Sequence, residues 1–160
     1  VTADIGCYAL GAAAPLKAVE TIVCMGASIG MARGAAEAGY KYSFGVIGDS
    51  TFLHSGLTGL VDAVATNTPM TVIILDNSIV AMTGCQPTML PSSQLEKAIL
   101  GIGVDPKHLR VIEAKPNLVE ENAGIFVEEA EYRGLSVIVM VRECLEAVRL
   151  RKKHEAVKNA

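Results

Sequence analysis

A strand–helix–strand pattern in the middle of the chain constrains its fold more than any other feature. Residues 42–47 and 70–75 are strand-like runs, and residues 52–67 between them read as one helix. A crossover of this kind makes the two strands parallel. The residues that follow the two strands therefore emerge at the same carboxyl edge, where open α/β sheets bind ligands.

Side chains that carry oxygen atoms follow both strands. The tetrapeptide Gly48-Asp49-Ser50-Thr51 follows the first strand, and Asp76-Asn77 ends the second. A carboxylate and an amide oxygen at one edge suit a hard cation such as Mg²⁺. The small residues after Asp49 open a helix, whose free N–H groups suit a phosphate. The sequence therefore predicts a site for Mg²⁺ and a diphosphate, although Asp49 could also serve only as a helix cap.

The rest of the chain alternates between strand and helix patterns. Further strands are expected at 1–5, 109–113 and 136–141, and further helices at 26–39, 94–101, 118–133 and 145–159. A long loop is expected at 78–93. This alternation implies an α/β fold with a doubly wound, mostly parallel sheet and helices on both faces. Gly26, Gly30 and Gly34 share one face of the 26–39 helix, which predicts that this face packs closely against the sheet.

Composition narrows the class of protein. A chain of 160 residues fits a single domain, here 1–160, and its 51% hydrophobic content indicates strands that are covered on both faces. That content also leaves apolar surface to spare, as expected of one part of a larger assembly. The net charge of −3 and the lack of a basic stripe argue against a nucleic-acid partner. The glutamates, Glu129 among them, are expected mostly on a solvated face.

Membrane insertion and metal clusters are also disfavoured by the sequence. The apolar runs are interrupted before they reach the length of a membrane span, and no secretory signal is visible. The four cysteines, Cys7, Cys24, Cys85 and Cys144, are far apart and form no CxxC motif, which argues against zinc or an iron–sulfur cluster in this chain. Reduced cysteines favour a cytoplasmic location. Because the chain starts at Val1 within a strand pattern, we expect it to be part of a longer protein.

Four sequence blocks carry a resemblance to a known family. Asp49 and Asn77 lie 28 residues apart, a spacing that resembles the thiamine diphosphate signature. The blocks are Asp-Ile-Gly-Cys-Tyr at 4–8, Met-Gly-Ala-Ser-Ile-Gly at 25–30, Gly-Asp-Ser-Thr-Phe-Leu-His-Ser-Gly at 48–56 and Ala-Met-Thr-Gly-Cys-Gln at 81–86. Together they resemble the thiamine-diphosphate domain of the alpha subunit of indolepyruvate:ferredoxin oxidoreductases, over about residues 4–144.

The resemblance implies an activity that this chain cannot perform alone. It implies oxidative decarboxylation of an aryl 2-oxoacid to an acyl-coenzyme A, with ferredoxin as the electron acceptor and with thiamine diphosphate and Mg²⁺ as cofactors. A catalytic carboxylate is expected from a pyrimidine-binding domain, and iron–sulfur clusters from other domains or a beta-type subunit. A dimer or a higher oligomer is therefore expected.

The resemblance also implies roles for individual residues. It gives Mg²⁺ three protein ligands: Asp49, Asn77 and the backbone carbonyl of Ile79. The residues expected to contact thiamine diphosphate are Gly6, Cys7, Met25, Ser28, Gly48, Asp49, Ser50, Thr51, Asn77, Ile79, Ala81, Met82 and Thr83. Met25 would support the bent cofactor, although a core position is the alternative for this residue.

Two further residues are candidates for the chemistry. His54 lies one turn after the phosphate-binding residues, where a neutral imidazole could donate to a substrate oxygen. Cys7 would lie against the cofactor. The alternatives are a polar helix position for His54 and a buried small hydrophobe for Cys7.

Two other functions stay open from the sequence. One is a subunit of a non-oxidative thiamine-dependent 2-oxoacid decarboxylase of the sulfopyruvate or phosphonopyruvate type. The other is a non-catalytic assembly module, which loss of Asp49 or Asn77 would have favoured.

Overall fold

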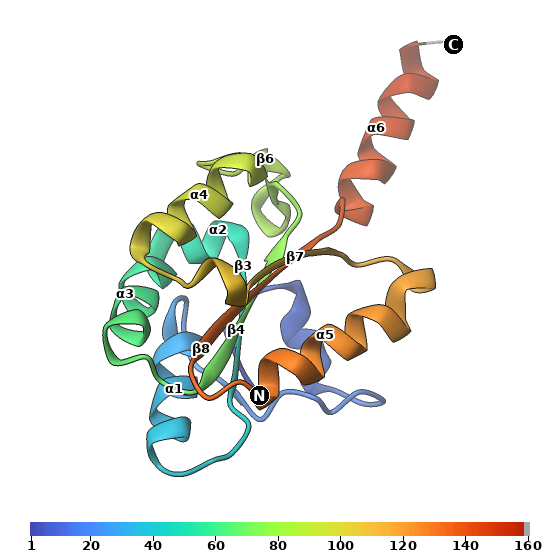
Figure 1. Ribbon diagram of the computed structural model, residues 1–160. Helices are drawn as coiled ribbons and strands as arrows, with labels where there is room; N and C mark the ends of the chain where they lie inside the picture. The colour runs from blue at the N-terminus through green and yellow to red at the C-terminus, as the bar shows by residue number, and fades with distance from the viewer. Residues whose placement is uncertain (159–160) are drawn as a thin grey trace.

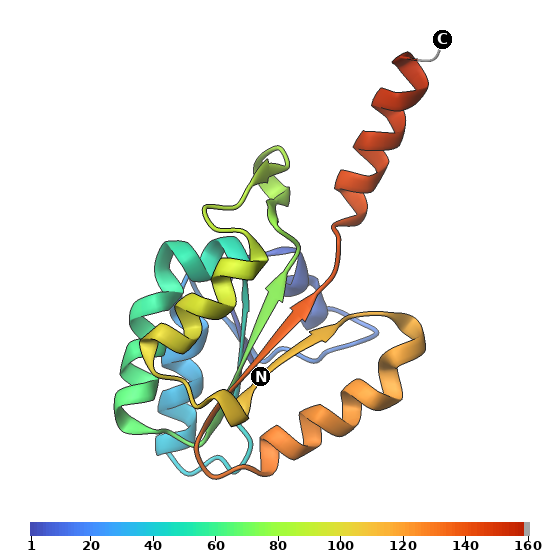
Figure 2. The ribbon, with the colours of Figure 1, turned by 45° about the horizontal axis from the view of Figure 1, so that its top comes forward.

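Six parallel strands form one sheet, and helices cover both of its faces, in the computed structural model of residues 1–158 (Figures 1 and 2). The strands of this sheet are β1 (Thr2–Ala3), β2 (Thr21–Ile22), β3 (Phe44–Gly48), β4 (Met70–Asp76), β7 (Leu109–Glu113) and β8 (Leu135–Val141). A separate antiparallel hairpin pairs β5 (Ile79–Val80) with β6 (Gln86–Pro87). The α-helices are α1 (Ala27–Glu37), α2 (Asp49–Thr51), α3 (Leu57–Thr66), α4 (Ser92–Ile102), α5 (Val119–Glu131) and α6 (Leu145–Lys158).

The strand order is β2-β1-β3-β4-β8-β7, so the two strands of the central crossover are neighbours. Gly48 at the end of β3 pairs with Leu75 in β4, which in turn pairs with Met140 in β8. The carboxyl ends of these three strands are therefore aligned in register. This confirms the predicted doubly wound α/β fold.

The helices form two unequal layers. Helices α1, α3 and α4 lie on one face of the sheet, while α5 lies on the other (Figure 2). The core includes the fully buried side chains of Ile29, Phe52, Leu60, Ile74 and Ile99. Helix α6 extends away from the rest of the molecule (Figure 1). No helix in the described part of the chain is both long and apolar enough to cross a membrane.

Most predicted elements are present, with shifted ends. The expected helices at 26–39, 52–67, 94–101 and 118–133 correspond to α1, the helical stretch 49–66, α4 and α5. The stretch 49–66 is continuous but contains a π-helical segment, η2 (Phe52–Gly56), between α2 and α3. The expected helix 145–159 corresponds to α6, and Asn159 lies outside the described residues.

Several local expectations are wrong. The strand expected at 1–5 has only two residues, and neither β2 nor the 3-10 helix η1 (Cys7–Ala12) was expected. The 78–93 loop contains the β5–β6 hairpin. Gly30 and Gly34 are exposed, and a Cβ atom there would meet nothing within 4 Å, so they do not face the sheet. Helix α1 instead buries Ser28, Ile29 and Ala32.

Glu129 also departs from expectation, because its side chain is fully buried. Its carboxylate accepts a 2.9 Å hydrogen bond from His108 Nδ1 and pairs with Arg110. The His108 ring stacks on Tyr132. A paired carboxylate with hydrogen bonds to both oxygens can be buried on the inner side of α5, whereas an isolated one could not.

Candidate cofactor site

A cavity of about 390 Å³ lies at the carboxyl edge of the central strands. It brings together twelve of the residues predicted from the sequence, namely Gly6, Cys7, Met25, Gly48, Asp49, Ser50, Thr51, Asn77, Ile79, Ala81, Met82 and Thr83. Its other lining residues are Ile5, Tyr8, Leu75 and Val80. Polar groups that follow β3 and β4 thus share one cavity with apolar side chains. This composition suits a ligand that has an apolar body and a polar head.

Asp49 is the buried anion of the cavity, with 4% of its surface exposed. Its Oδ1 accepts a 2.7 Å hydrogen bond from the Ser50 backbone N–H. Its Oδ2 accepts from the backbone N–H groups of Asn77 and Ser78, at 3.1 and 2.8 Å. The carboxylate therefore accepts hydrogen bonds both from the start of the helical stretch after β3 and from the turn after β4, and it holds these two segments together.

The environment of Asp49 raises its pKa to about 6. Burial is the largest cause, and the neighbouring carboxyl of Asp76 adds to the effect, while the N–H groups of Ser50 and Ser78 oppose it. Neither carboxylate forms an ion pair with a basic side chain in the described residues. A cation beside Asp49 would favour its charged form. Asp49 is therefore a buried carboxylate that no basic side chain of the described residues neutralises, and this observation fits a metal at the site.

The turn after β4 carries the other two expected metal ligands. Asn77 Oδ1 accepts a 3.1 Å hydrogen bond from the Ile79 backbone N–H, and Ser78 adopts a left-handed backbone with φ +60°. No group of three His, Cys, Asp or Glu side chains that could hold a metal occurs in residues 1–158. The expected set does not need such a group, because it combines one carboxylate, one amide oxygen and one backbone carbonyl.

A buried aspartate that directly follows β1 positions the N-terminus of α1 near the site. Asp4 is fully buried, and its two carboxylate oxygens accept from Gly26 N–H at 2.8 Å and from Ser28 N–H at 2.7 Å. Gly26 has φ +86°, and a Cβ atom there would lie 2.6 Å from the carbonyl oxygen of Ser55. Only glycine lets the start of α1 approach the 49–66 stretch so closely.

Ser28 differs from the other predicted contacts. It is fully buried and does not line the cavity, and its hydroxyl oxygen has no hydrogen-bond partner among the described residues. Its backbone N–H is already taken by Asp4. Ser28 thus lies behind the cavity wall, and its contact with a diphosphate stays a prediction.

The remaining predicted contacts form the mouth of the cavity. Met25 is 44% exposed and Met82 is 67% exposed, and Cys7 is exposed as well. Neither Met25 nor Cys7 occupies the core position that was the alternative for it. Ala81, Met82 and Thr83 form the turn between β5 and β6, where Thr83 Oγ1 donates a 2.9 Å hydrogen bond to Gln86. The apolar half of the cavity is therefore open to the outside.

His54 does not line the cavity. It lies on the π-helical segment η2 with an exposed side chain, and its Nδ1 is 2.7 Å from Ser55 Oγ. The predicted role of His54 in catalysis stays a prediction, and it requires a substrate or a partner that approaches from outside this chain.

Sequence reasoning missed two residues that build the site. Tyr8 lines the cavity, and its phenol oxygen accepts a 3.0 Å hydrogen bond from Gly48 N–H. Asp4 holds the start of α1. Both residues lie in the 4–8 block, so their presence in a motif was visible, but nothing local indicated which distant groups they contact.

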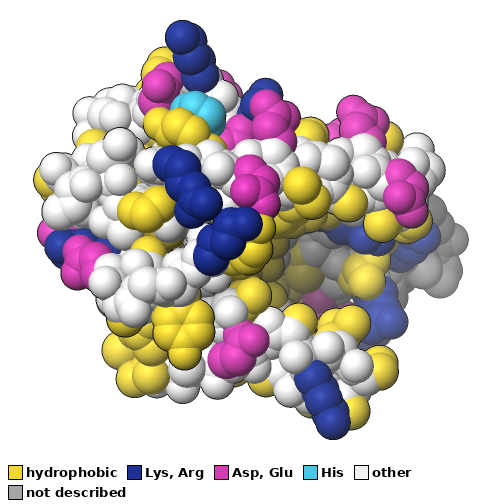
Figure 3. All heavy atoms as spheres, turned by 60° about the horizontal axis from the view of Figure 1, so that its bottom comes forward, with side chains coloured by type: hydrophobic (Ala, Val, Ile, Leu, Met, Phe, Trp, Pro, Cys, Tyr) yellow, Lys and Arg dark blue, Asp and Glu magenta, His cyan; other side chains and the backbone are white. Residues whose placement is uncertain are grey.

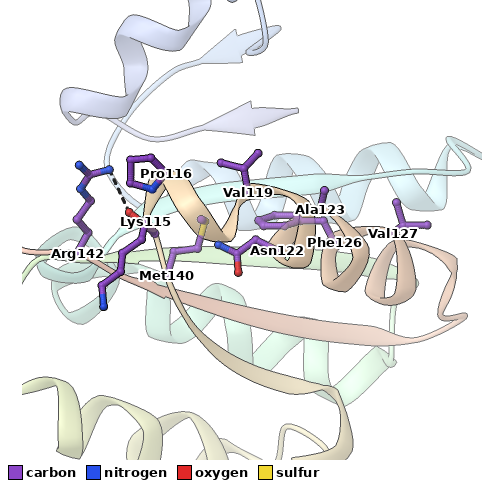
Figure 4. Close-up of a pocket in the computed structure, with 10 residues that line it drawn as sticks. Lys115, Pro116, Val119, Asn122, Ala123, Phe126, Val127, Met140 and Arg142 are labelled. Atoms are coloured by element: carbon purple, nitrogen blue, oxygen red, sulfur yellow. Dashed lines mark hydrogen bonds between the residues drawn. The ribbon is translucent and has the colours of Figure 1, made fainter.

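A larger cavity of about 770 Å³ lies between α5 and the ends of β7 and β8 (Figure 4). Its wall is mostly apolar, with Val119, Phe126 and Met140 among its residues. Arg142 lies at its edge and donates a 3.0 Å hydrogen bond to the Ala114 carbonyl. Figure 3 shows a recess in the molecular surface that hydrophobic side chains line. Among the described residues, no carboxylate, thiol or imidazole lines this cavity, and its charged lining residues are Lys115 and Arg142.

Comparison with protein families agrees with the geometry of the smaller cavity. The model of the thiamine pyrophosphate enzyme C-terminal TPP-binding domain matches residues 4–115. The chain belongs to this family. The match spans both Asp49 and Asn77, which confirms the recognition of a thiamine-diphosphate-binding domain.

The chain is also similar in sequence to individual curated proteins, which are more specific relatives than the family as a whole. The chain is 34% identical over 164 residues to the indolepyruvate oxidoreductase subunit IorA of Pyrococcus abyssi, which covers 88% of this chain. It is 32% identical over 151 residues to the IorA subunit of Archaeoglobus fulgidus, again over 88% of this chain. The chain spans about a quarter of the length of these relatives, 25% and 24% respectively.

Solved structures agree on the fold. A 2-oxoglutarate:ferredoxin oxidoreductase from Magnetococcus marinus superposes with a TM-score of 0.67 and 14% identity, over 95% of this chain and 58% of that one. A thiamine diphosphate-dependent 4-hydroxybenzoylformate decarboxylase from Rhodococcus jostii gives a TM-score of 0.54 and 20% identity, over 74% of this chain and 23% of that one. At these identities the similarity is one of fold.

Proposed function

We propose that this chain is the thiamine diphosphate- and Mg²⁺-binding module of an indolepyruvate:ferredoxin oxidoreductase. The observation that carries the proposal is the cavity that joins the buried Asp49 to Asn77 and Ile79, within a domain of the thiamine pyrophosphate family. Similarity to two IorA subunits over 88% of the chain supports the indolepyruvate type.

In this proposal, the polar end of the cavity holds the metal and the diphosphate. Asp49 supplies the charged oxygen, Asn77 supplies an amide oxygen, and Ile79 supplies its backbone carbonyl. Mg²⁺ requires oxygen ligands in an octahedron, so diphosphate oxygens and water would fill the remaining positions. Ser50 and Thr51 offer hydroxyl and N–H donors to the diphosphate at the start of the helical stretch.

The apolar end of the cavity holds the rings. Met25, Ile5 and Met82 offer flexible or branched apolar side chains there, and Met is suited to an irregular surface. When bound, thiamine diphosphate supplies the nucleophilic carbon and the electron sink that decarboxylation of a 2-oxoacid requires. This chain supplies placement: it anchors the charged end of the cofactor and supports its rings.

The rest of the enzyme must come from outside this chain. The side chains of Ile5, Met25 and Met82 at the cavity mouth are 43%, 44% and 67% exposed, which supports a covering domain. We assign that cover to a pyrimidine-binding domain that also provides the catalytic carboxylate. A beta-type subunit or further domains would carry the iron–sulfur clusters, with ferredoxin, coenzyme A and an aryl 2-oxoacid as reactants. The chain would then be one domain of a longer, oligomeric and cytoplasmic protein.

The test uses the complete enzyme with its partner subunits. Calorimetric titration with thiamine diphosphate should give binding in the presence of Mg²⁺ and much weaker binding in the presence of a chelator. With indolepyruvate or phenylpyruvate, coenzyme A and oxidised ferredoxin, the enzyme should reduce ferredoxin. Binding that is indifferent to the chelator would contradict the metal assignment.

The same assay separates the alternative functions. A non-oxidative decarboxylase would release CO₂ and an aldehyde without any electron acceptor. An assembly module would bind no cofactor. Coupled ferredoxin reduction and acyl-coenzyme A formation would exclude both.

A further inference from the structure

Asp76 is a buried carboxylate that none of the proposed roles uses. It ends β4, with 3% of its surface exposed, and its backbone carbonyl accepts a 2.9 Å hydrogen bond from the Arg142 N–H. Its Oδ1 accepts from both the N–H and the hydroxyl of Ser78, at 3.0 and 3.3 Å. Its Oδ2 is buried and has no hydrogen-bond partner in the described part of the chain. Half of this carboxylate is therefore unsatisfied.

The unsatisfied carboxylate lies beside Asp49. Both aspartates accept a hydrogen bond from the same donor, the Ser78 N–H, at 2.8 Å for Asp49 and 3.0 Å for Asp76. Two acceptors that share one N–H must lie close together. Two buried carboxylates in contact repel each other, and their burial is costly without a compensating cation. No basic side chain among the described residues pairs with either of them.

A local role in the turn explains only part of this arrangement. An aspartate that accepts from the N–H two residues later forms a common turn motif, and Oδ1 of Asp76 does so. A neutral asparagine would form the same turn without placing a second negative charge next to Asp49. The unpartnered Oδ2 is the feature that the turn leaves unexplained.

We propose that Asp76 is a positioning residue of the metal centre, whose Oδ1 fixes the turn that carries Asn77 and Ile79 and whose charge strengthens cation binding beside Asp49. The inference rests on the proposed function, because it concerns the same cation. Its energetic consequence is that the cation-free site is destabilised by two neighbouring carboxylates. The site then gains more from a divalent cation than one carboxylate alone would allow.

The decisive variant is Asp76→Asn in the complete enzyme at neutral pH. The asparagine carbonyl retains both bonds from Ser78, and its NH₂ group can donate to Asp49 in place of the repulsive contact. We expect the affinity for Mn²⁺ or Mg²⁺, measured with saturating thiamine diphosphate, to fall roughly 10- to 100-fold. We expect the thermal unfolding midpoint of the metal-free enzyme to rise. Opposite changes in these two quantities are the signature of the proposed role.

A matched control is Glu129→Gln, which also converts a buried carboxylate to an amide. Glu129 is fully paired with His108 and Arg110 and does not line the cofactor cavity, so this variant should lower the unfolding midpoint and leave the metal affinity unchanged. A lower unfolding midpoint of metal-free Asp76→Asn would mean that Asp76 only stabilises the turn. An unchanged metal affinity in this variant would also overturn the inference. If the wild-type enzyme binds thiamine diphosphate without any metal, the proposed function fails as well, so the wild-type titration separates the two failures.

Discussion

The phenol oxygen of Tyr8 accepts a hydrogen bond from the backbone N–H of Gly48, over 3.0 Å. This contact joins the segment after β1 to the end of β3, next to Asp49. The Tyr8 ring also leaves little space for side chains at positions 6 and 48. A Cβ atom on Gly6 would lie 2.3 Å from the ring, and one on Gly48 would lie 3.3 Å from it. The glycines at 6 and 48 therefore leave room for one aromatic ring that closes this side of the cavity.

The first prediction concerns the ionisation of Tyr8. Burial is the largest cause that raises its pKa to about 12, and the carboxylates of Asp4 and Asp49 add to it. Because the folded pKa exceeds the ordinary value of 10.0, Tyr8 stabilises the fold below pH 10, and this contribution is lost as the pH rises through 12. The difference in tyrosinate absorbance between wild type and Tyr8→Phe should therefore titrate with a midpoint near 12.

The stability of Tyr8→Phe completes this test. The variant leaves Gly48 N–H without its acceptor, which costs about 1–3 kcal/mol if water cannot replace it. Tyr40→Phe is the control, because Tyr40 is 70% exposed and contacts no site residue in the described hydrogen bonds. A titration midpoint of Tyr8 at the ordinary value of 10.0, together with an unchanged stability of Tyr8→Phe, would show that the phenol is exposed to solvent and does not bond to Gly48.

The second prediction concerns Asp49. Asp49→Ala in the complete enzyme should weaken binding of thiamine diphosphate with Mg²⁺ by more than ~2 kcal/mol, because metal and phosphate lose a charged ligand. Asp49→Asn keeps an acceptor for Asn77 and Ser78, so it separates loss of charge from collapse of the turn. Calorimetric titration with and without chelator measures both variants. Affinity equal to that of wild type in Asp49→Asn would remove the carboxylate from the metal centre.

The third prediction compares two glycines of the same helix region. Gly26→Ala should destabilise the fold by about 1–3 kcal/mol, because a left-handed φ of +86° is strained for alanine and its Cβ would meet the Ser55 carbonyl at 2.6 Å. Gly30→Ala should instead stabilise it by about 0.5–1 kcal/mol, because that position is helical and has free space around it. Denaturant unfolding of both variants measures the pair.

The cofactor adds a second measurement for this pair. Gly26→Ala should weaken binding of thiamine diphosphate, since it pushes the start of α1 away from the 49–66 stretch, while Gly30→Ala should not. The same response from both variants would mean that the close approach at Gly26 is not needed.

The central unit of the fold was predictable because its signals are local. Strand β4 is a run of apolar residues that is long enough to be covered on both faces, and β7 has the predicted bounds of 109–113. Once the crossover is recognised, the meeting of Asp49 and Asn77 follows from parallel topology alone. The metal-site hypothesis therefore needed only two strand ends and the helical pattern between them.

The remaining features depend on contacts between distant residues. Strand β2 has two residues and exists because it pairs with β1, while Asp4 acts on N–H groups that lie 22 and 24 residues later. Glu129 looked like one of many surface glutamates, and its burial depends on Arg110 and His108 from the β7 region. Residue type and spacing carry no information about such partners. Gly30 is the opposite case. The spacing of the glycines predicted that this face of α1 packs against the sheet, but Gly30 lies on the exposed side of the helix.

The last prediction concerns His54. It lies on the π-helical segment three residues after Thr51, exposed and outside the cavity, with Nδ1 at 2.7 Å from Ser55 Oγ. If a covering domain closes the cavity and places substrate over this segment, the tautomer of His54 with its proton on Nε2 can donate to a substrate oxygen that develops charge, while Nδ1 accepts from the Ser55 hydroxyl. Loss of such a donor lowers kcat by about 10²-fold or more.

His54→Ala in the complete enzyme should therefore lower kcat for indolepyruvate by that factor and leave the affinity for thiamine diphosphate with Mg²⁺ nearly unchanged, because Asp49, Asn77 and Ile79 are untouched. His54→Gln, which retains an N–H donor, should recover part of the rate if donation rather than proton transfer matters. Ser55→Ala is the neighbouring control: it removes the Nδ1 contact but keeps the imidazole, so a smaller loss is expected. Steady-state kinetics with a ferredoxin acceptor measure all three variants. An unchanged kcat in His54→Ala would leave this residue as a polar position on an exposed helical turn, and the substrate oxygen would then have to be held by the covering domain.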